Sequence, residues 1–247
     1  MKAEVVLTVS ESKRLIARGV ASLPFIQEKM QQGIIVVTSG STNAYLYEEL
    51  TGQTIDKRAY LTGRTTPAKA KAAWGVEPLA DLVLVDGKPD PSLNRFTALE
   101  KMQQGDVYVK GANALNYGVG VAGIAIGHPT GGTIGGAIGS IIAKKLRLLI
   151  PVGLEKEVPF DIAEASALIA EPDERLGPVH ALWAVSGLIF TEIEALEELA
   201  GVEVYPVGAG GIAGAEGGLR LLVVGTPETV RAAVEIVEGI QGEPPIA

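Results

Sequence analysis

A run of small polar residues near the start of the chain separates an apolar segment from a helical pattern. The apolar segment is Ile34 to Val37, and the polar turn extends from Thr38 to Asn43. At such a turn the first helical N–H groups lack intrahelical partners, and the positive end of the helix dipole faces outward. The turn therefore predicts a phosphate or carboxylate site, with an ordinary helix cap as the alternative. The candidate residues are Ser39, Gly40, Ser41, Thr42 and Asn43.

A second glycine-rich turn, from Gly127 to Thr133, follows the apolar run Val121 to Ile126. His128 in this turn could donate to an anion or act as an acid or base near neutral pH. The alternative is a structural histidine that is hydrogen-bonded in a tight loop. The turn lacks the Gly-Lys-Ser/Thr ending of a Walker loop and is not a dinucleotide-binding fingerprint. The candidate residues here are His128, Thr130, Gly131, Gly132 and Thr133.

Two charged residues each follow a short apolar run directly. Lys110 comes after Val107 to Val109, and Asp86 comes after Leu82 to Val85. In a parallel sheet both would reach the edge that carries the anion-binding turn. Lys110 could neutralise a phosphate or serve as a base, and otherwise it is a solvated surface amine. Asp86 is the carboxylate candidate, and otherwise it serves a simple Asp-Gly turn. The predicted binding set also includes Gly111 and Asn113.

These turns lie between apolar runs that read as buried strands. Helical periodicity and capping signals fill the segments between most of them. Continuous apolar strands are typical of parallel sheets that are covered on both faces. We therefore expect an α/β fold with a mainly parallel sheet flanked by helices. The expected strands of this sheet are 34–37, 82–85, 107–109, 121–126 and 146–152.

The last part of the chain is strongly acidic. From Glu171 to Ala247, thirteen acidic residues stand against three arginines. Residues 171–178 read as a linker, and beyond them the order strand, helix, strand, strand, helix is close to a ferredoxin-like unit. We therefore expect an α/β ligand-binding domain at 1–175. A smaller, acidic α+β domain with a ferredoxin-like fold would occupy 176–247.

The composition limits the cofactors and partners. The 247 residues include no cysteine and two histidines, so we expect no metal and no other cofactor. A net charge of −8 without a basic stripe argues against a nucleic-acid partner. The uncharged stretch from Gly111 to Ala143 is long enough to span a membrane, but a polar loop and frequent glycines interrupt it. We expect no membrane partner, a cytoplasmic location because no signal-peptide core is apparent, and a plausible homo-oligomer.

The segments Thr38 to Thr42 and Asp106 to Leu115 together resemble the superfamily of ribose-phosphate isomerases, glucosamine-phosphate deaminases and CoA transferases. The segment Glu11 to Ala17 is similar to the start of such domains, and the resemblance covers about residues 10 to 155. It implies that the Gly-Ser-Thr turn binds the phosphate of a sugar and that the later turn lies beside the reacting carbons. Isomerases of this group carry an acidic residue where this chain has Asn113. A glutamate motif of the CoA-transferase kind is not visible.

The residues thus favour a protein that binds a small anionic metabolite, either a sugar phosphate or a carboxylate. Isomerase-like chemistry on that ligand stays open, with Asp86 or Lys110 as the base for enolisation. A non-catalytic metabolite sensor or assembly protein is the first alternative, favoured by the missing carboxylate in the second turn. CoA-ester binding or transfer is the other alternative, and it requires a nucleophilic glutamate.

Overall fold

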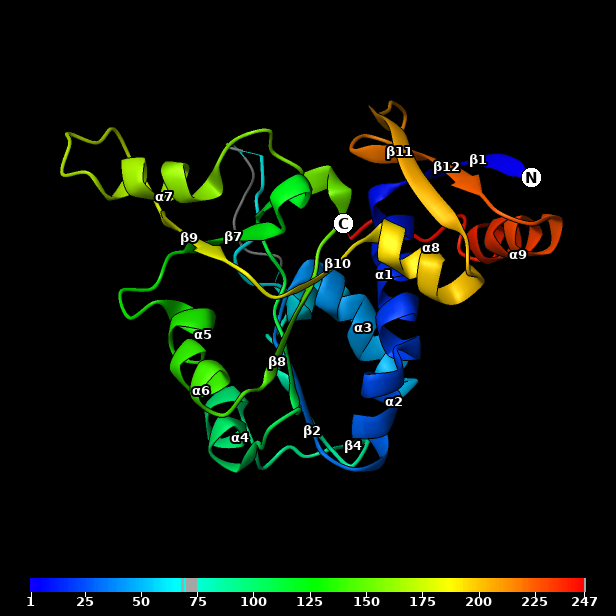
Figure 1. Ribbon diagram of the computed structural model, residues 1–247. Helices are drawn as coiled ribbons and strands as arrows, with labels where there is room; N and C mark the ends of the chain where they lie inside the picture. The colour runs from blue at the N-terminus through cyan, green and yellow to red at the C-terminus, as the bar shows by residue number, and fades with distance from the viewer. Residues whose placement is uncertain (68, 70–74, 247) are drawn as a thin grey trace.

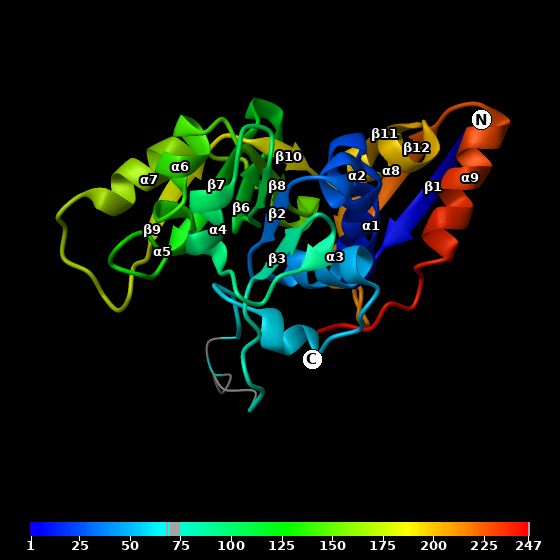
Figure 2. The ribbon, with the colours of Figure 1, turned by 90° about the horizontal axis from the view of Figure 1, so that it is seen from below.

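The computed structural model describes residues 1–67, 69 and 75–246. Within them, a six-stranded sheet runs through the centre, and a three-stranded sheet lies to either side of it (Figure 1). Helices cover both faces of the central sheet (Figures 1 and 2). The expected α/β class is therefore confirmed.

The central sheet is mixed in direction. Its order is β10-β8-β5-β2-β3-β4, and the pairs β10/β8, β8/β5 and β5/β2 are parallel. The pairs β2/β3 and β3/β4 are antiparallel. Over the three described sheets, six of the nine strand pairings are antiparallel. The prediction of a mainly parallel sheet is wrong, because a continuous apolar run indicates burial on both faces but not strand direction. The strands are β2 (Ile34–Val37), β3 (Leu82–Val85), β4 (Lys88–Pro89), β5 (Val107–Val109), β8 (Arg147–Pro151) and β10 (Leu188–Phe190).

One face of the central sheet is covered by α1, α2 and α3, and the other by α4, α5 and α6 (Figures 1 and 2). A capping box starts α1, because Thr8 Oγ1 accepts from Glu11 N and Glu11 Oε2 accepts from Thr8 N. The strands β2 and β5 between these layers are fully buried, residue by residue. The helices are α1 (Val9–Ser22), α2 (Pro24–Gln31), α3 (Ser41–Thr51), α4 (Arg95–Lys101), α5 (Gly132–Gly135) and α6 (Ile138–Ala143).

The two smaller sheets join segments that are far apart in the sequence. One has the order β1-β12-β11 and packs with α8 and α9, and the other has the order β6-β7-β9 and packs with α7. Their strands are β1 (Lys2–Leu7), β6 (Ala114–Asn116), β7 (Val121–Ile126), β9 (Ala181–Val185), β11 (Glu203–Gly210) and β12 (Gly218–Val224). The remaining helices are α7 (Ile162–Ala170), α8 (Glu192–Ala200) and α9 (Pro227–Glu238), with short 3-10 turns η1 (Lys57–Tyr60), η2 (Tyr117–Val119) and η3 (Leu154–Lys156).

A ferredoxin-like unit at the end of the chain is not confirmed. The segment expected as one strand divides into β9, which pairs with β7, and β10, which joins the central sheet beside β8. The N-terminal strand β1 supplies the third strand to β11 and β12. Residues 171–180 are all exposed, as a linker would be, yet strands on both sides of them share each sheet. The domain division near residue 175 stays a prediction.

The uncharged stretch from Gly111 to Ala143 forms β6, β7 and the short helices α5 and α6. A helix with the length and apolar character to cross a membrane is not found in the described part of the chain.

Candidate functional site

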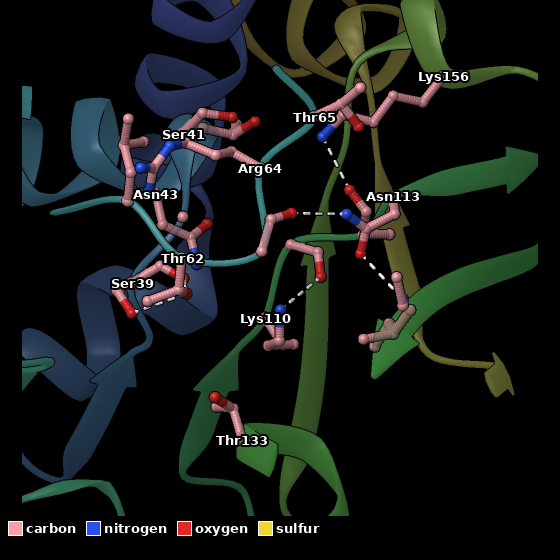
Figure 3. Close-up of a pocket in the computed structure, with 18 of the residues that line it drawn as sticks. Ser39, Ser41, Asn43, Thr62, Arg64, Thr65, Lys110, Asn113, Thr133 and Lys156 are labelled. Atoms are coloured by element: carbon pink, nitrogen blue, oxygen red, sulfur yellow. Dashed lines mark hydrogen bonds between the residues drawn. The ribbon is translucent and has the colours of Figure 1, made fainter. Parts of the chain in front are cut away.

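A cavity of about 870 Å³ opens at the edge where the parallel strands β2, β5 and β8 end (Figure 3). Loops that follow the carboxyl ends of parallel strands meet at one edge, which is why distant turns converge there. Twelve of the fourteen predicted binding residues line this cavity. They are Ser39, Gly40, Ser41, Thr42, Asn43, Lys110, Gly111, Asn113, His128, Gly131, Gly132 and Thr133.

The polar turn before α3 is held by its own first N–H groups. Ser39 N donates to Asp81 Oδ1 at 2.8 Å, and Gly40 N donates to Tyr60 O at 2.8 Å. The Ser39 hydroxyl lies 3.1 Å from Thr62 Oγ1. These contacts fix the position of the turn, and they remove two of its N–H groups from the donors available to a ligand.

The next three N–H groups, those of Ser41, Thr42 and Asn43, have no hydrogen-bond partner among the described residues. Gly40 caps α3 without a side-chain hydrogen bond, and a Cβ built on it would meet nothing within 4 Å. Thr42 Oγ1 and Asn43 Oδ1 are also buried and unpartnered. The start of α3 therefore presents unsatisfied donors and a positive dipole end to an open space.

Basic side chains outnumber acidic ones among the described residues of the cavity wall. The basic residues are Lys13, Arg64, Lys110 and Lys156, and the acidic ones are Glu155 and Glu157. The whole chain carries a net charge of −8, so the cavity is locally opposite in sign to the protein. A concave site with an excess of one sign of charge raises the local concentration of oppositely charged ligands.

Lys110 is half-buried at the end of β5. Its Nζ donates to Gly111 O at 3.1 Å, and no described carboxylate lies within ion-pair distance of it. Burial lowers the pKa of Lys110 to about 8, and the nearby positive charge of Lys156 acts in the same direction. Lys110 is therefore a desolvated amine rather than a solvated surface amine.

Asn113 joins two walls of the cavity. Its Nδ2 donates to Gly63 O at 2.9 Å, and its Oδ1 accepts from Ala125 N at 3.0 Å (Figure 3). The side chain thereby links the loop that carries Arg64 to strand β7. Both ends of the amide are occupied, so Asn113 braces the cavity wall.

The second glycine-rich turn lines the cavity with His128 and with residues 131–133. His128 is exposed, and its Nδ1 lies 2.8 Å from Thr130 Oγ1 within the same turn. Thr130 does not line the cavity. The helix that follows, α5, has four residues and ends at Gly135, so the turn does not begin a long helix.

Asp86 lies at the other end of the sheet, away from the cavity. Strand β3 runs antiparallel to β2, so the residue after β3 stands beside the residue before β2. The Asp86 carboxylate accepts from Gly33 N at 2.8 Å. The expectation that Asp86 joins the anion turn is wrong, because it assumed a parallel strand.

A carboxyl pair at the cavity wall was not predicted from the sequence. Glu155 lines the cavity, and Glu192 is fully buried beside it. A Cβ built on Gly153 would meet an oxygen of each carboxyl group, at 3.0 Å for Glu192 Oε1, so both groups crowd the same point. Those two oxygens have no hydrogen-bond partner, whereas Glu192 Oε2 accepts from Leu154 N at 3.0 Å. Burial raises the pKa of Glu192 to about 7, and the charge of Glu155 adds to the rise.

The sequence pattern around Glu155 could have pointed to the cavity, whereas the pattern around Glu192 could not. Glu155 lies in the loop that follows β8, in η3, so a search of the loops after parallel strands could have located it. Glu192 stands directly after Thr191 at the start of α8, where an acidic residue is ordinary. Lys13, on α1, faces both glutamates across the cavity wall, and burial lowers its pKa while they oppose that effect.

Among the described residues, no group of three or more His, Cys, Asp or Glu side chains could hold a metal ion. Searches against protein-family models, curated proteins and solved structures find no match to this chain.

Proposed function

We propose that the cavity binds a small anionic metabolite, a sugar phosphate or a carboxylate. The observation that carries this proposal is the row of three unpartnered N–H groups at Ser41, Thr42 and Asn43, which face an open space at Gly40. Buried backbone donors are nearly always satisfied in native proteins, so a bound group with several acceptor oxygens is the expected partner. Phosphate and carboxylate groups provide such oxygens and are favoured by the helix dipole.

The basic residues of the wall support the same proposal. Lys110 and Lys156 approach the cavity from β5 and η3, and Lys13 approaches from α1. A volume of about 870 Å³ falls within the range of small-molecule sites, which extends to roughly 1,000 Å³.

A catalytic role of the isomerase type is the second part of the proposal, and the carboxyl pair favours it over a sensor without catalysis. Glu155 borders the cavity, and Glu192 behind it exchanges a proton near neutral pH. Glu155 is the carboxyl group of the pair that lines the cavity, so it would take a proton from one carbon of the ligand and return it to the next. Glu155 would then do the work for which the turn at Asn113 has no acid.

The binding proposal is tested by titrating inorganic phosphate, ribose 5-phosphate and citrate while following thermal unfolding. An anion at 100 times its Kd should stabilise the protein by about 2.7 kcal/mol. Gly40→Leu should abolish the shift, because the new side chain fills the open space before α3 and the extended backbone tolerates it. Gly139→Leu is the matched control, since Gly139 is exposed in α6 and also has open space around its Cβ position. No shift with any anion, or an equal shift in the Gly40 variant, contradicts the proposal.

The catalytic part is tested separately with Glu155→Gln. This variant should keep the thermal shift with ribose 5-phosphate. Incorporation of deuterium from solvent into that sugar, followed by nuclear magnetic resonance, should fall by about 10²- to 10⁴-fold, the usual contribution of a positioned acid–base group. Binding without exchange in the unsubstituted protein supports the sensor instead.

A further inference from the structure

We propose that Lys110 is a nucleophilic amine that forms a Schiff base with the carbonyl group of the bound metabolite. The anionic character of that metabolite rests on the proposed function, whereas the reactivity of the amine does not. The inference narrows the ligand to an anion that also carries an aldehyde or a ketone.

The backbone of Lys110 is held firmly, and its amine has a single hydrogen-bond partner. Strand β5 lies between β2 and β8, and Lys110 N donates to Leu149 O at 2.9 Å, so the backbone is anchored in the middle of the sheet. The amine itself makes one hydrogen bond, to Gly111 O at 3.1 Å. Figure 3 shows the side chain between the turn of Asn113 and Thr133. A nucleophile needs this combination of a fixed stem and an amine without a carboxylate partner.

The surroundings of Lys110 keep part of the amine uncharged. Burial, Lys156 at the end of η3 and Arg95 at the start of α4 lower its pKa, and Asp81 before β3 opposes them. At pH 7 a pKa of about 8 in place of 10.5 raises the neutral fraction by about 300-fold. A desolvated lysine beside a second cation is a recognised arrangement for Schiff-base formation.

Lys13 and Lys156 also line the cavity, but each is less suited to this reaction. Burial also lowers the pKa of Lys13, but the charges of Glu155 and Glu192 oppose that effect and favour its ammonium form. Lys156 Nζ donates to Ala112 O at 2.8 Å and supports the turn after β5. Lys110 combines a strong downward pKa shift with the absence of a carboxylate within ion-pair distance among the described residues.

The chemistry needs no further reagent. The neutral Lys110 amine attacks the carbonyl carbon, a C–N bond forms, and the carbonyl electron pair moves to oxygen. The amine loses a proton, the oxygen gains protons to leave as water, and a C=N bond remains. Overall, one ammonium group and one carbonyl compound give one protonated imine and one water, so atoms and charge balance.

Reductive trapping tests the proposal. The intact protein is treated at pH 7 with pyridoxal 5′-phosphate, an anionic aldehyde, or with propanal, a neutral one, and the imine is reduced with cyanoborohydride. Peptide mass spectrometry then measures the label at each lysine. We expect at least about tenfold more label at Lys110 than at the exposed Lys88, a smaller ratio than the amine fractions alone because nucleophilicity falls with pKa. Inorganic phosphate should compete with pyridoxal 5′-phosphate but not with propanal.

The outcomes separate the two proposals. Preferential labelling of Lys110 by propanal, with no advantage for the phosphorylated aldehyde, supports the nucleophile and contradicts the anion site. A thermal shift with phosphate together with label spread evenly over the lysines supports the anion site and overturns the nucleophile. Lys110→Met should remove the main adduct, and Lys88→Met should leave it unchanged. Because the label is mapped in the unsubstituted protein, the test stands even if the Lys110 variant folds poorly.

Discussion

The two edges of the central sheet carry similar polar residues and treat them differently. At the edge where β2 and β5 begin, Gly33 N donates to Asp86 Oδ1 at 2.8 Å and Ile34 N donates to Asp106 Oδ1 at 3.2 Å. At the opposite edge, the N–H groups of residues 41–43 have no partner in the described chain.

This difference separates structural turns from binding turns more clearly than residue type does. At both edges, a glycine, an acidic residue and a lysine lie next to the end of a buried strand. Asp106 is almost fully buried, yet each of its oxygens has a donor, and Lys29 lies 3.5 Å away. Glu155 and Glu192 are crowded together with one unpartnered oxygen each. Native proteins seldom leave buried polar groups without hydrogen-bond partners, so a ligand is expected at the cavity edge, where such groups occur.

The largest contrast is expected from one substitution made at each edge. Gly87, beside Asp86, has φ of +73°, and a Cβ there would collide with Met30 O. Gly87→Ala should therefore lower the free energy of unfolding by about 4 kcal/mol, from backbone strain and overpacking together. Gly40 has an extended backbone and open space at its Cβ position, so Gly40→Ala should change the free energy of unfolding by less than about 0.5 kcal/mol. Urea denaturation measures both, and equal losses would remove the structural distinction between the edges.

The next effect concerns the pH dependence of stability at the cavity edge. The pKa of Glu192 is raised to about 7 in the folded protein from 4.5. A raised carboxyl pKa gives stability that is present below about pH 4.5 and is lost as the pH rises through 7. Relative to Glu192→Gln, which cannot ionise, the unsubstituted protein should lose about 3 kcal/mol of unfolding free energy between pH 4.5 and 8. Denaturation curves at several pH values check this, and a constant difference between the two proteins would exclude the linkage.

A smaller effect is expected at the paired edge from Asp106→Asn. Asp106 Oδ1 accepts from Ile34 N, and Oδ2 accepts from Gln103 N at 2.8 Å. An amide can accept through one atom only, so one buried N–H loses its partner, at a cost of about 2 kcal/mol. The thermal shift produced by phosphate should stay unchanged in this variant. A weakened shift would show that the two edges are coupled.

Local sequence patterns predicted the parts of the site that depend on neighbours along the chain. The turn before α3 could be located because an apolar strand, a polar run and a helix follow one another within a few residues. The capping boxes at Thr8 and Thr191 were predictable for the same reason. Lys110 reached the expected edge because β5 is indeed parallel to β2.

Features that depend on long-range pairing were not predictable. The direction of β3 decides the place of Asp86, and β1 completes a sheet with strands more than 200 residues later. The use of Ser39 N by Asp81 arises from a contact 42 residues away. Glu192 has the local pattern of a helix-capping acid, and only its burial beside Glu155 changes its chemistry.

The smallest expected effect tests the residue that the sequence pattern placed at the wrong edge. Asp86 is exposed and has φ of +48°, a conformation that asparagine adopts with little strain. In Asp86→Asn the side-chain oxygen can still accept from Gly33 N, so the unfolding free energy should fall by about 0.5 kcal/mol or less. The phosphate shift and the label at Lys110 should both be unchanged, because the carboxylate is at the far edge of the sheet from the cavity. If Asp86→Asn instead reduced deuterium exchange into ribose 5-phosphate while Glu155→Gln did not, the acid–base group would lie at the edge that carries Asp86. Unpartnered polar groups would then not distinguish the binding edge of the sheet from the structural one.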